Sequence, residues 1–175
     1  MLKRRDVLAA GIGLPLAGAA AAAKSLHPAA KPAVPLVGAW TLIDAMTVQK
    51  DGRTGPWNDL PRPYNGLIVY QANGLMAVQI ASARSPLPET TDFTAIPTDQ
   101  QLAFLKTYYA YYGRYEFDHA TSIVTHFVQS SLDPTEMGAV FQRRVKLVGD
   151  VVTLTTIPRA SATSGAHNVL SWRRN

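Results

Sequence analysis

From residue 37 onward, hydrophobic and polar side chains alternate in short runs that are separated by turn residues. Eight runs follow this pattern: residues 37–48, 67–71, 75–82, 111–118, 122–130, 139–148, 151–157 and 167–173. A period of two places successive side chains on opposite faces of a strand, so each run predicts a β-strand with one buried face. Asn73-Gly74, between the second and third runs, is typical of a tight hairpin. Consecutive strands with mostly short connections predict an all-β fold, an eight-stranded antiparallel up-and-down barrel.

One segment between the third and fourth runs has helical spacing instead. Its apolar residues fall three to four positions apart: Leu102, Leu105, Tyr109 and Tyr112. Thr98 followed by Gln101 fits a capping box, which marks a helix start. The pattern therefore predicts one amphipathic helix over residues 99–109, inserted between strands 3 and 4 of the barrel.

The two ends of the strand region carry a pattern that predicts closure. Gly38 and Trp40 open the first strand, and Trp172 and Arg173 close the last one. An arginine can stack on an indole while it donates hydrogen bonds to backbone carbonyls. We therefore expect Arg173 to lie over Trp40 and to plug one end of the barrel.

The N-terminus has the features of an export signal. Lys3, Arg4 and Arg5 precede a Gly/Ala-rich apolar stretch, and the adjacent arginines fit the twin-arginine pattern. Residues 1–23 are thus predicted to be a signal peptide that directs the chain through the Tat export machinery to the periplasm or outside the cell. A retained membrane anchor is the alternative, but a stretch of about 17 residues interrupted by Pro15 is marginal for spanning a bilayer, so no stable membrane insertion is expected after cleavage.

Residues 24–35, rich in Pro and Ala, are predicted to form a linker, and residues 36–175 to form the barrel domain. The formal net charge of +5 arises partly from the signal, and no basic stripe with interleaved aromatic residues is present, so nucleic acid is not an expected partner. The chain has no cysteine, so its stability must come from a hydrophobic core.

Few side chains are candidates for chemistry. The histidines lack the spacing of a metal-ligand set, so no metal and no cofactor are predicted. His126 lies in the middle of a strand among apolar residues, where a hydrogen-bonded wall or core position is expected. Arg143 shares a face with Phe141 and Val145 and is expected to point inward. An inward arginine must be paired or meet a polar ligand.

Tyrosines concentrate around the corner between the helix and the fourth strand. A tyrosine gives an apolar wall a hydrogen-bonding tip, so Tyr112 and Tyr115 are candidate ligand contacts, with core packing as the alternative. Tyr70 and Gln79, which flank the hairpin on adjacent strands, are weaker candidates of the same kind.

A catalytic set is not evident in the sequence. There is no Gly-x-Ser-x-Gly motif, and the lack of cysteine excludes a thiol nucleophile. Asp44 has the same strand parity as Trp40 and Leu42, so it is expected to point inward, as an acid or base or as the partner of Arg143. Catalytic residues are left unassigned.

Several segments, in this order, resemble the bacterial and fungal lipocalin-like domain family. They are Leu36-Val37-Gly38-Ala39-Trp40-Thr41-Leu42, Gly66 to Tyr70, Asn73-Gly74-Leu75-Met76-Ala77-Val78-Gln79, Tyr112-Gly113-Arg114-Tyr115, Val124-Thr125-His126, Arg143-Arg144, Gly149-Asp150-Val151-Val152-Thr153-Leu154-Thr155 and Leu170-Ser171-Trp172. The resemblance covers about residues 35–175. It implies an eight-stranded barrel with a helix after the third strand, and it implies little about activity.

These observations lead to one main functional hypothesis and three alternatives. The main hypothesis is an exported barrel that binds a small hydrophobic or amphipathic molecule in its lumen. The first alternative is a cyclase or isomerase with His126, Arg143, Tyr115 and Asp44 as acid-base groups. The others are a haem-binding barrel with His126 as ligand and a filled barrel with a structural or protein-binding role.

Overall fold

The computed structural model describes residues 34–84, 90, 92–158 and 165–175. The predicted signal, residues 1–23, and nearly all of the predicted linker, residues 24–35, lie outside this part of the chain. Residues 33–175 form one compact unit. Within the described residues, no helix is long and apolar enough to span a bilayer.

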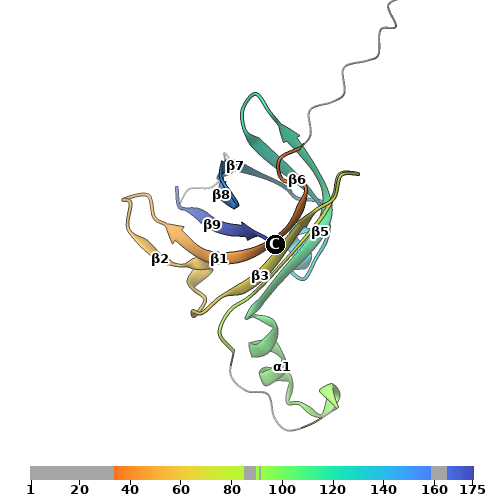
Figure 1. The fold of residues 1–175 in the computed structure, drawn as a ribbon. Helices are drawn as coiled ribbons and strands as arrows, with labels where there is room; N and C mark the ends of the chain where they lie inside the picture. Colours follow the sequence, from red (N-terminus) through yellow and green to blue (C-terminus); the bar gives the residue numbers. More distant parts are fainter. Residues whose placement is uncertain (1–33, 85–89, 91, 159–164) are drawn as a thin grey trace, which may run out of the picture. The chain divides into compact units, whose positions relative to one another are not determined.

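The described chain is dominated by nine antiparallel strands (Figure 1). They are β1 (Gly38–Val48), β2 (Thr54–Pro56), β3 (Asn65–Tyr70), β4 (Leu75–Ala81), β5 (Tyr108–Asp118), β6 (Ile123–Ser131), β7 (Val140–Val148), β8 (Val151–Thr156) and β9 (His167–Arg174). From β3 to β9 each strand pairs with the next, and β1 pairs with both β3 and β9, which closes the sheet. The short β2 pairs with the end of β1 alone. The predicted closed eight-stranded antiparallel barrel is thus confirmed, with β2 as an addition to it.

The inserted helix lies in the predicted connection but differs in length and packing. Helix α1 (Thr98–Leu105) lies between β4 and β5, so it is shorter than the predicted range of 99–109, and Tyr109 already belongs to β5. Pro97 is the N-cap residue and makes no side-chain capping bond; the Gln101 amide donates instead to the carbonyls of Phe93 and Ile96. The predicted Thr98–Gln101 capping box is therefore wrong, and no residue of α1 is buried. In Figure 1 the helix projects beyond the end of the sheet.

Three short 3-10 helices complete the connections: η1 (Trp57–Asp59), η2 (Phe93–Ala95) and η3 (Pro134–Glu136). Of these, η1 and η3 matter for function, because they bring Trp57 and Glu136 to the same end of the barrel, where both line a cavity.

The inward faces of the strands form one hydrophobic core. The alternation expected for β5 is confirmed: Tyr111 and Tyr115 are buried, whereas Tyr112 and Arg114 are exposed. His126 on β6 is fully buried, although a polar side chain. Its burial among aromatic and aliphatic neighbours means that its hydrogen-bond partners must come from the protein itself.

A β-bulge in β1 changes which side chains face the core. Leu42 pairs with Trp172, but the next pairing along β1 is Asp44 with Ser171, so Ile43 has no partner on β9. A bulge inserts one residue and reverses the alternation beyond it. Ala45 is therefore fully buried, and Asp44 pairs with Arg62 at the partly exposed surface. The prediction that Asp44 points inward or pairs with Arg143 is wrong for this reason.

One end of the barrel is plugged as expected, but by the neighbouring arginine. The guanidinium carbon of Arg174 lies 4.0 Å from the centroid of the Trp40 ring, and its nitrogens donate to the carbonyls of Val37 and Pro35. Trp40 and Arg174 are directly opposite each other in the β1–β9 pairing, and opposite residues share a face. Arg173 points the other way, toward Asp150. The predicted stacking partner, Arg173, is thus wrong by one position.

Candidate functional site

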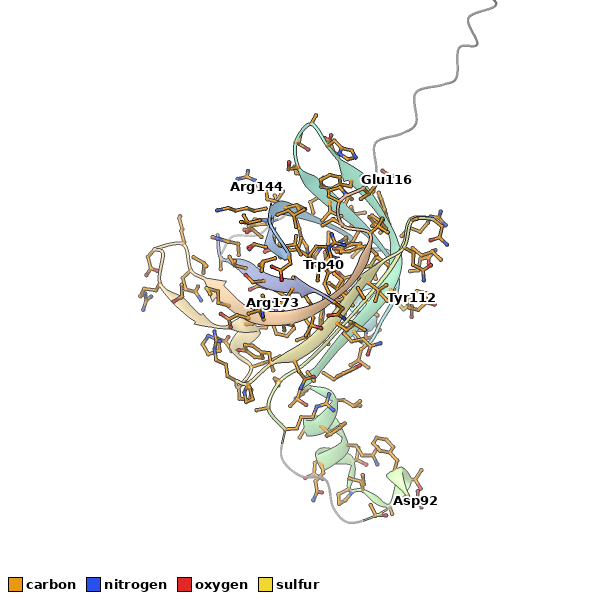
Figure 2. All side chains as sticks on the ribbon, in the orientation of Figure 1. Trp40, Asp92, Tyr112, Glu116, Arg144 and Arg173 are labelled. Carbon is orange, nitrogen blue, oxygen red and sulfur yellow. The ribbon has the colours of Figure 1, made fainter. Side chains whose placement is uncertain are left out.

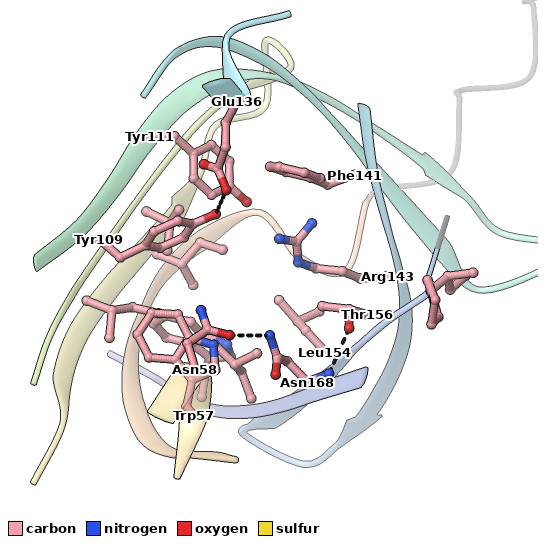
Figure 3. Close-up of a pocket in the computed structure, with 17 residues that line it drawn as sticks. Trp57, Asn58, Tyr109, Tyr111, Glu136, Phe141, Arg143, Leu154, Thr156 and Asn168 are labelled. Carbon is pink, nitrogen blue, oxygen red and sulfur yellow. Dashed lines mark hydrogen bonds between the residues drawn. The ribbon is translucent and has the colours of Figure 1, made fainter. Parts of the chain in front are cut away.

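The barrel contains a partly enclosed cavity of about 310 Å³ (Figure 3). Its apolar wall includes residues of five strands, Ile68, Val78, Ile80, Phe141, Leu154 and Leu170, and also Ile157 and Pro158 after β8. Aromatic rings with a polar atom add Trp57, Tyr109, Tyr111 and Trp172. The polar side chains on the wall are Asn58, Glu136, Arg143, Thr156 and Asn168. A mainly apolar cavity with a few placed polar groups is the usual form of a small-molecule site.

A tyrosine–histidine–tyrosine cluster supports one side of this cavity. The Tyr70 hydroxyl lies 2.8 Å from Nε2 of His126, and the Tyr111 hydroxyl lies 2.6 Å from Nδ1. All three side chains are buried, and the Tyr115 ring packs edge-on against Tyr70. Tyr111 lines the cavity, whereas His126 lies behind it.

The environment of His126 keeps its imidazole neutral. Burial lowers the pKa of His126 well below its usual value, and the charge of Arg143 lowers this pKa further. A neutral imidazole has one N–H donor and one acceptor nitrogen. One of the two tyrosine hydroxyls therefore donates to His126, and the other accepts from it.

Arg143 projects from β7 into the cavity (Figure 3). Its guanidinium carbon lies 5.3 Å from the centroid of the Phe141 ring. Nη1 is buried and has no hydrogen-bond partner in the described part of the chain. The same holds for Nε1 of Trp172, another wall residue. The strand parity that predicted an inward Arg143 is confirmed, and the neighbouring Arg144 is exposed and lies outside the barrel in Figure 2.

Glu136 brings a carboxylate to the wall of the cavity. It accepts hydrogen bonds from the hydroxyls of Tyr109, at 3.2 Å, and Ser131, at 2.9 Å. Burial raises the pKa of Tyr109, and the nearby Tyr111 and Glu136 raise it further, so Tyr109 remains a protonated donor. The Glu136 carboxylate is thus held in place by two hydroxyl groups.

The η1 loop forms the rim of the cavity. Trp57 is nearly fully buried and packs edge-on against Tyr64 and Tyr109, with ring centroids 6.1 and 5.5 Å apart. The Asn58 side-chain oxygen accepts a hydrogen bond from the Asn168 amide at 3.0 Å, which joins η1 to β9. Two residues of this loop, Asn58 and Asp59, have positive φ angles, as the tight turn requires.

The predicted candidates divide into three groups. Arg143 lines the cavity, and Tyr70 and His126 lie directly behind its wall. Tyr115 is buried beside Tyr70 and donates to the carbonyl of Gln71. The remaining three candidates, Gln79, Tyr112 and Asp44, do not line the cavity.

These three lie outside the lumen for separate reasons. Gln79 is exposed and accepts a hydrogen bond from Tyr108 on the outer face of β4 and β5. Tyr112 is 54% exposed and lies on the outside of the barrel in Figure 2. Asp44 is turned away by the bulge in β1. The set proposed for acid-base chemistry, His126, Arg143, Tyr115 and Asp44, is therefore not brought together.

The sequence did not identify Tyr111, Glu136 or the two asparagines as site residues. Tyr111 had a recognisable signal, since its parity predicted a core-facing side chain. Glu136 lies in a 3-10 turn between strands, where no periodicity indicates direction. Asn58 and Asn168 meet only in the folded barrel, because 110 residues separate them in sequence.

The fold and its cavity define a class: closed antiparallel β-barrels with a lumen of small-molecule size. The comparison with protein families is more specific, since the model of the lipocalin-like domain matches residues 37–175. This chain belongs to the lipocalin-like domain family.

One relative is a 4'-hydroxy-3'-methoxypropiophenone carrier protein from Aspergillus oryzae. It is 29% identical over 107 residues, which cover 57% of this chain and 96% of the relative. No solved structure matches this chain significantly.

Proposed function

We propose that this protein binds one small, mainly apolar molecule in the barrel lumen and serves as its carrier. The observation that supports this most directly is the cavity, whose volume of about 310 Å³ suits a molecule of one or two rings. The fungal relative described as a carrier of an aromatic ketone belongs to the same functional class.

An access route at the η1 end is consistent with this role. A second, more open depression adjoins the cavity and shares three of its residues, Trp57, Asn58 and Tyr109. Leu102 and Leu105 of α1 line its outer side and are exposed. A hydrophobic ligand would thus meet apolar side chains before it reaches the lumen.

Intrinsic fluorescence can test the proposal, because Trp57 and Trp172 both line the cavity. The purified protein would be titrated with a panel of aromatic ketones and phenols that includes 4'-hydroxy-3'-methoxypropiophenone. We expect saturable fluorescence changes with one site per chain for at least one compound. A ligand at about 100 times its Kd should also raise the free energy of unfolding by about 2.7 kcal/mol, which is visible as a higher Tm.

Two tryptophan substitutions on β8 provide a matched control. Thr156 lines the cavity, whereas Thr155 lies on the opposite face of the same strand. Thr156→Trp should fill the cavity and abolish the titration signal, and Thr155→Trp should preserve it. Equal binding by both variants, or no binding by the wild type to any compound, would contradict the proposal.

The two chemical alternatives have less support in this geometry. Both ring nitrogens of His126 lie within hydrogen-bond distance of tyrosine hydroxyls, so haem ligation would have to displace one of them. The four groups considered for acid-base catalysis face different environments, and Arg143 alone among them lines the cavity. Binding without chemistry therefore accounts for the site with fewer assumptions.

We also propose that residues 1–23 direct export through the Tat machinery. The paired Arg4 and Arg5 before the apolar stretch support this proposal. Cell fractionation of a bacterium that expresses the full chain should find the protein outside the cytoplasm. Replacement of both arginines by lysine should retain it inside, and unchanged export of this variant would contradict the Tat route.

A further inference from the structure

The cavity wall presents hydrogen-bond donors for which the described residues supply no acceptor. Nη1 of Arg143 and Nε1 of Trp172 are buried and unpartnered within the described residues. A buried N–H without an acceptor lowers stability, and it does so more strongly when the donor is charged. Both donors belong to residues on the wall of the same cavity, so an acceptor in the lumen would relieve this cost.

Arg143 also forms no ion pair among the described residues. The ion pairs of the described chain join Arg53 to Asp51, Arg62 to Asp44 and Arg173 to Asp150, and none of them includes Arg143. Glu136 lies on the same cavity, but its two oxygens accept from Tyr109 and Ser131. A guanidinium in a mainly apolar cavity favours an anion as the occupant.

The tyrosine–histidine–tyrosine cluster adds a third donor. Neutral His126 accepts a hydrogen bond from one tyrosine hydroxyl and donates one to the other. If Tyr111 were the donor, the Tyr70 hydroxyl proton would be buried without an acceptor, because Tyr70 is 1% exposed and His126 is its one hydrogen-bond partner among the described residues. The opposite arrangement has Tyr70 donate to Nε2 and Nδ1–H donate to Tyr111.

In this second arrangement the Tyr111 hydroxyl proton has no acceptor in the cluster, and Tyr111 lines the cavity, where a ligand can accept it. It avoids the burial of an unpaired donor and is therefore the favoured one. Tyr111 and Arg143 then both present free N–H or O–H groups to the lumen.

We infer that the lumen ligand carries an oxyanion, a carboxylate, phenolate or sulfonate on an apolar body, which pairs with Arg143 and accepts a hydrogen bond from Tyr111. This inference rests on the proposed function and deepens it by assigning the chemical class of the ligand.

Two fluorescent probes with the same ring skeleton test this assignment. 1-Anilinonaphthalene-8-sulfonate is an anion, and N-phenyl-1-naphthylamine is its neutral counterpart. We expect the wild type to bind the anionic probe at least about tenfold more tightly, as one charge-assisted hydrogen bond predicts. Thr156→Trp should abolish binding of both probes, which identifies the lumen as their site.

The arginine variants supply the matched control. Arg143→Met keeps the length of the side chain and removes its charge. It should lower the affinity for the anionic probe at least about tenfold and change the affinity for the neutral probe less than about twofold. Arg144→Met, one position away on the outer face, should change neither. Tyr111→Phe should lower the affinity for the anionic probe and leave the affinity for the neutral probe unchanged.

The outcomes separate the two proposals. If the wild type binds both probes in the lumen with equal affinity, the oxyanion assignment is overturned and the carrier proposal stands. If neither probe nor any compound of the panel enters the lumen, the carrier proposal itself fails. The preference of the wild type for the anionic probe is measured without any variant. It therefore tests the assignment even if Arg143→Met does not fold.

Discussion

Arg174 stacks on Trp40, with its guanidinium carbon 4.0 Å from the ring centroid, and holds the start of β1 against the end of β9. The Trp40 indole donates in turn to the carbonyl of Leu36 at 2.8 Å. Residues near both ends of the domain are thereby joined at one end of the barrel. Neither Trp40 nor Arg174 lines the cavity, so this contact is separate from the cavity wall.

Arg174→Ala should lower the free energy of unfolding by about 1 to 2 kcal/mol, because it removes a cation–π contact and two hydrogen bonds to backbone carbonyls. Arg173→Ala is the matched control. Its side chain makes an exposed contact with Asp150 at 3.6 Å, so its loss should cost at most about 0.5 kcal/mol. Urea denaturation of both variants measures the difference, and equal losses would contradict the assignment of the plug to Arg174.

Gly38→Ala should destabilise the barrel by about 1 to 3 kcal/mol. Gly38 has a φ angle of +134°, and a Cβ added there would lie 2.9 Å from Nη1 of Arg174. Gly55→Ala tests the generic effect of the substitution, since Gly55 has no atom within 4 Å of an added Cβ. Thermal denaturation should show a lower Tm for Gly38→Ala alone. Equal Tm values for the two variants would contradict the explanation that the positive φ angle and Arg174 require a glycine at position 38.

The sequence was sufficient for the barrel because the signal for each strand is local. Alternation and turn residues define the strands, and their order defines the pairing of neighbours. The bulge in β1 leaves no comparable signal, since no glycine, proline or turn sequence marks Ile43 and Asp44. This single inserted position was enough to reverse the predicted direction of Asp44.

The site was predictable only in part, for a related reason. The alternation within a strand correctly placed Arg143 and Tyr115 on inward faces, because the direction of each side chain depends on its own strand alone. The His126 cluster requires partners 56 and 15 residues away, and their meeting depends on the registers of several strands. Glu136 and Trp57 come from short 3-10 turns, whose side-chain directions follow no repeat.

Tyr70→Phe should destabilise the fold by about 1 to 3 kcal/mol, because it leaves a nitrogen of fully buried His126 without a partner. Tyr70 does not line the cavity, so the affinity for a lumen ligand should change little. Tyr111→Phe should also lower stability, because it leaves Nδ1–H of His126 without an acceptor, and should in addition weaken binding of the lumen ligand. Stability from urea denaturation and affinity from fluorescence titration, measured on both variants, distinguish the two roles; a large loss of affinity in Tyr70→Phe would refute this division.

The buried His126 should make stability depend on pH between about 7 and 5. Its pKa is lowered well below 6.5 in the folded protein, whereas the unfolded chain has the ordinary value near 6.5. Below about pH 6.5 the unfolded state therefore binds a proton that the folded state does not, so the free energy of unfolding decreases as the pH falls. The slope from this one group approaches about 1.4 kcal/mol per pH unit.

His126→Gln is the variant that tests this origin, since glutamine retains hydrogen-bonding groups for both tyrosines and does not titrate. It should be less stable at pH 7 and should lose most of the slope between pH 7 and 5. The carboxylates whose pKa values are lowered, Asp51, Asp92, Asp118 and Asp133, act below this window, because their stabilisation is lost only near and below pH 4. His119→Gln, at an exposed turn, serves as the control and should keep the wild-type slope. An unchanged slope in His126→Gln would mean that the pH dependence arises elsewhere, and that His126 is not held neutral by its burial.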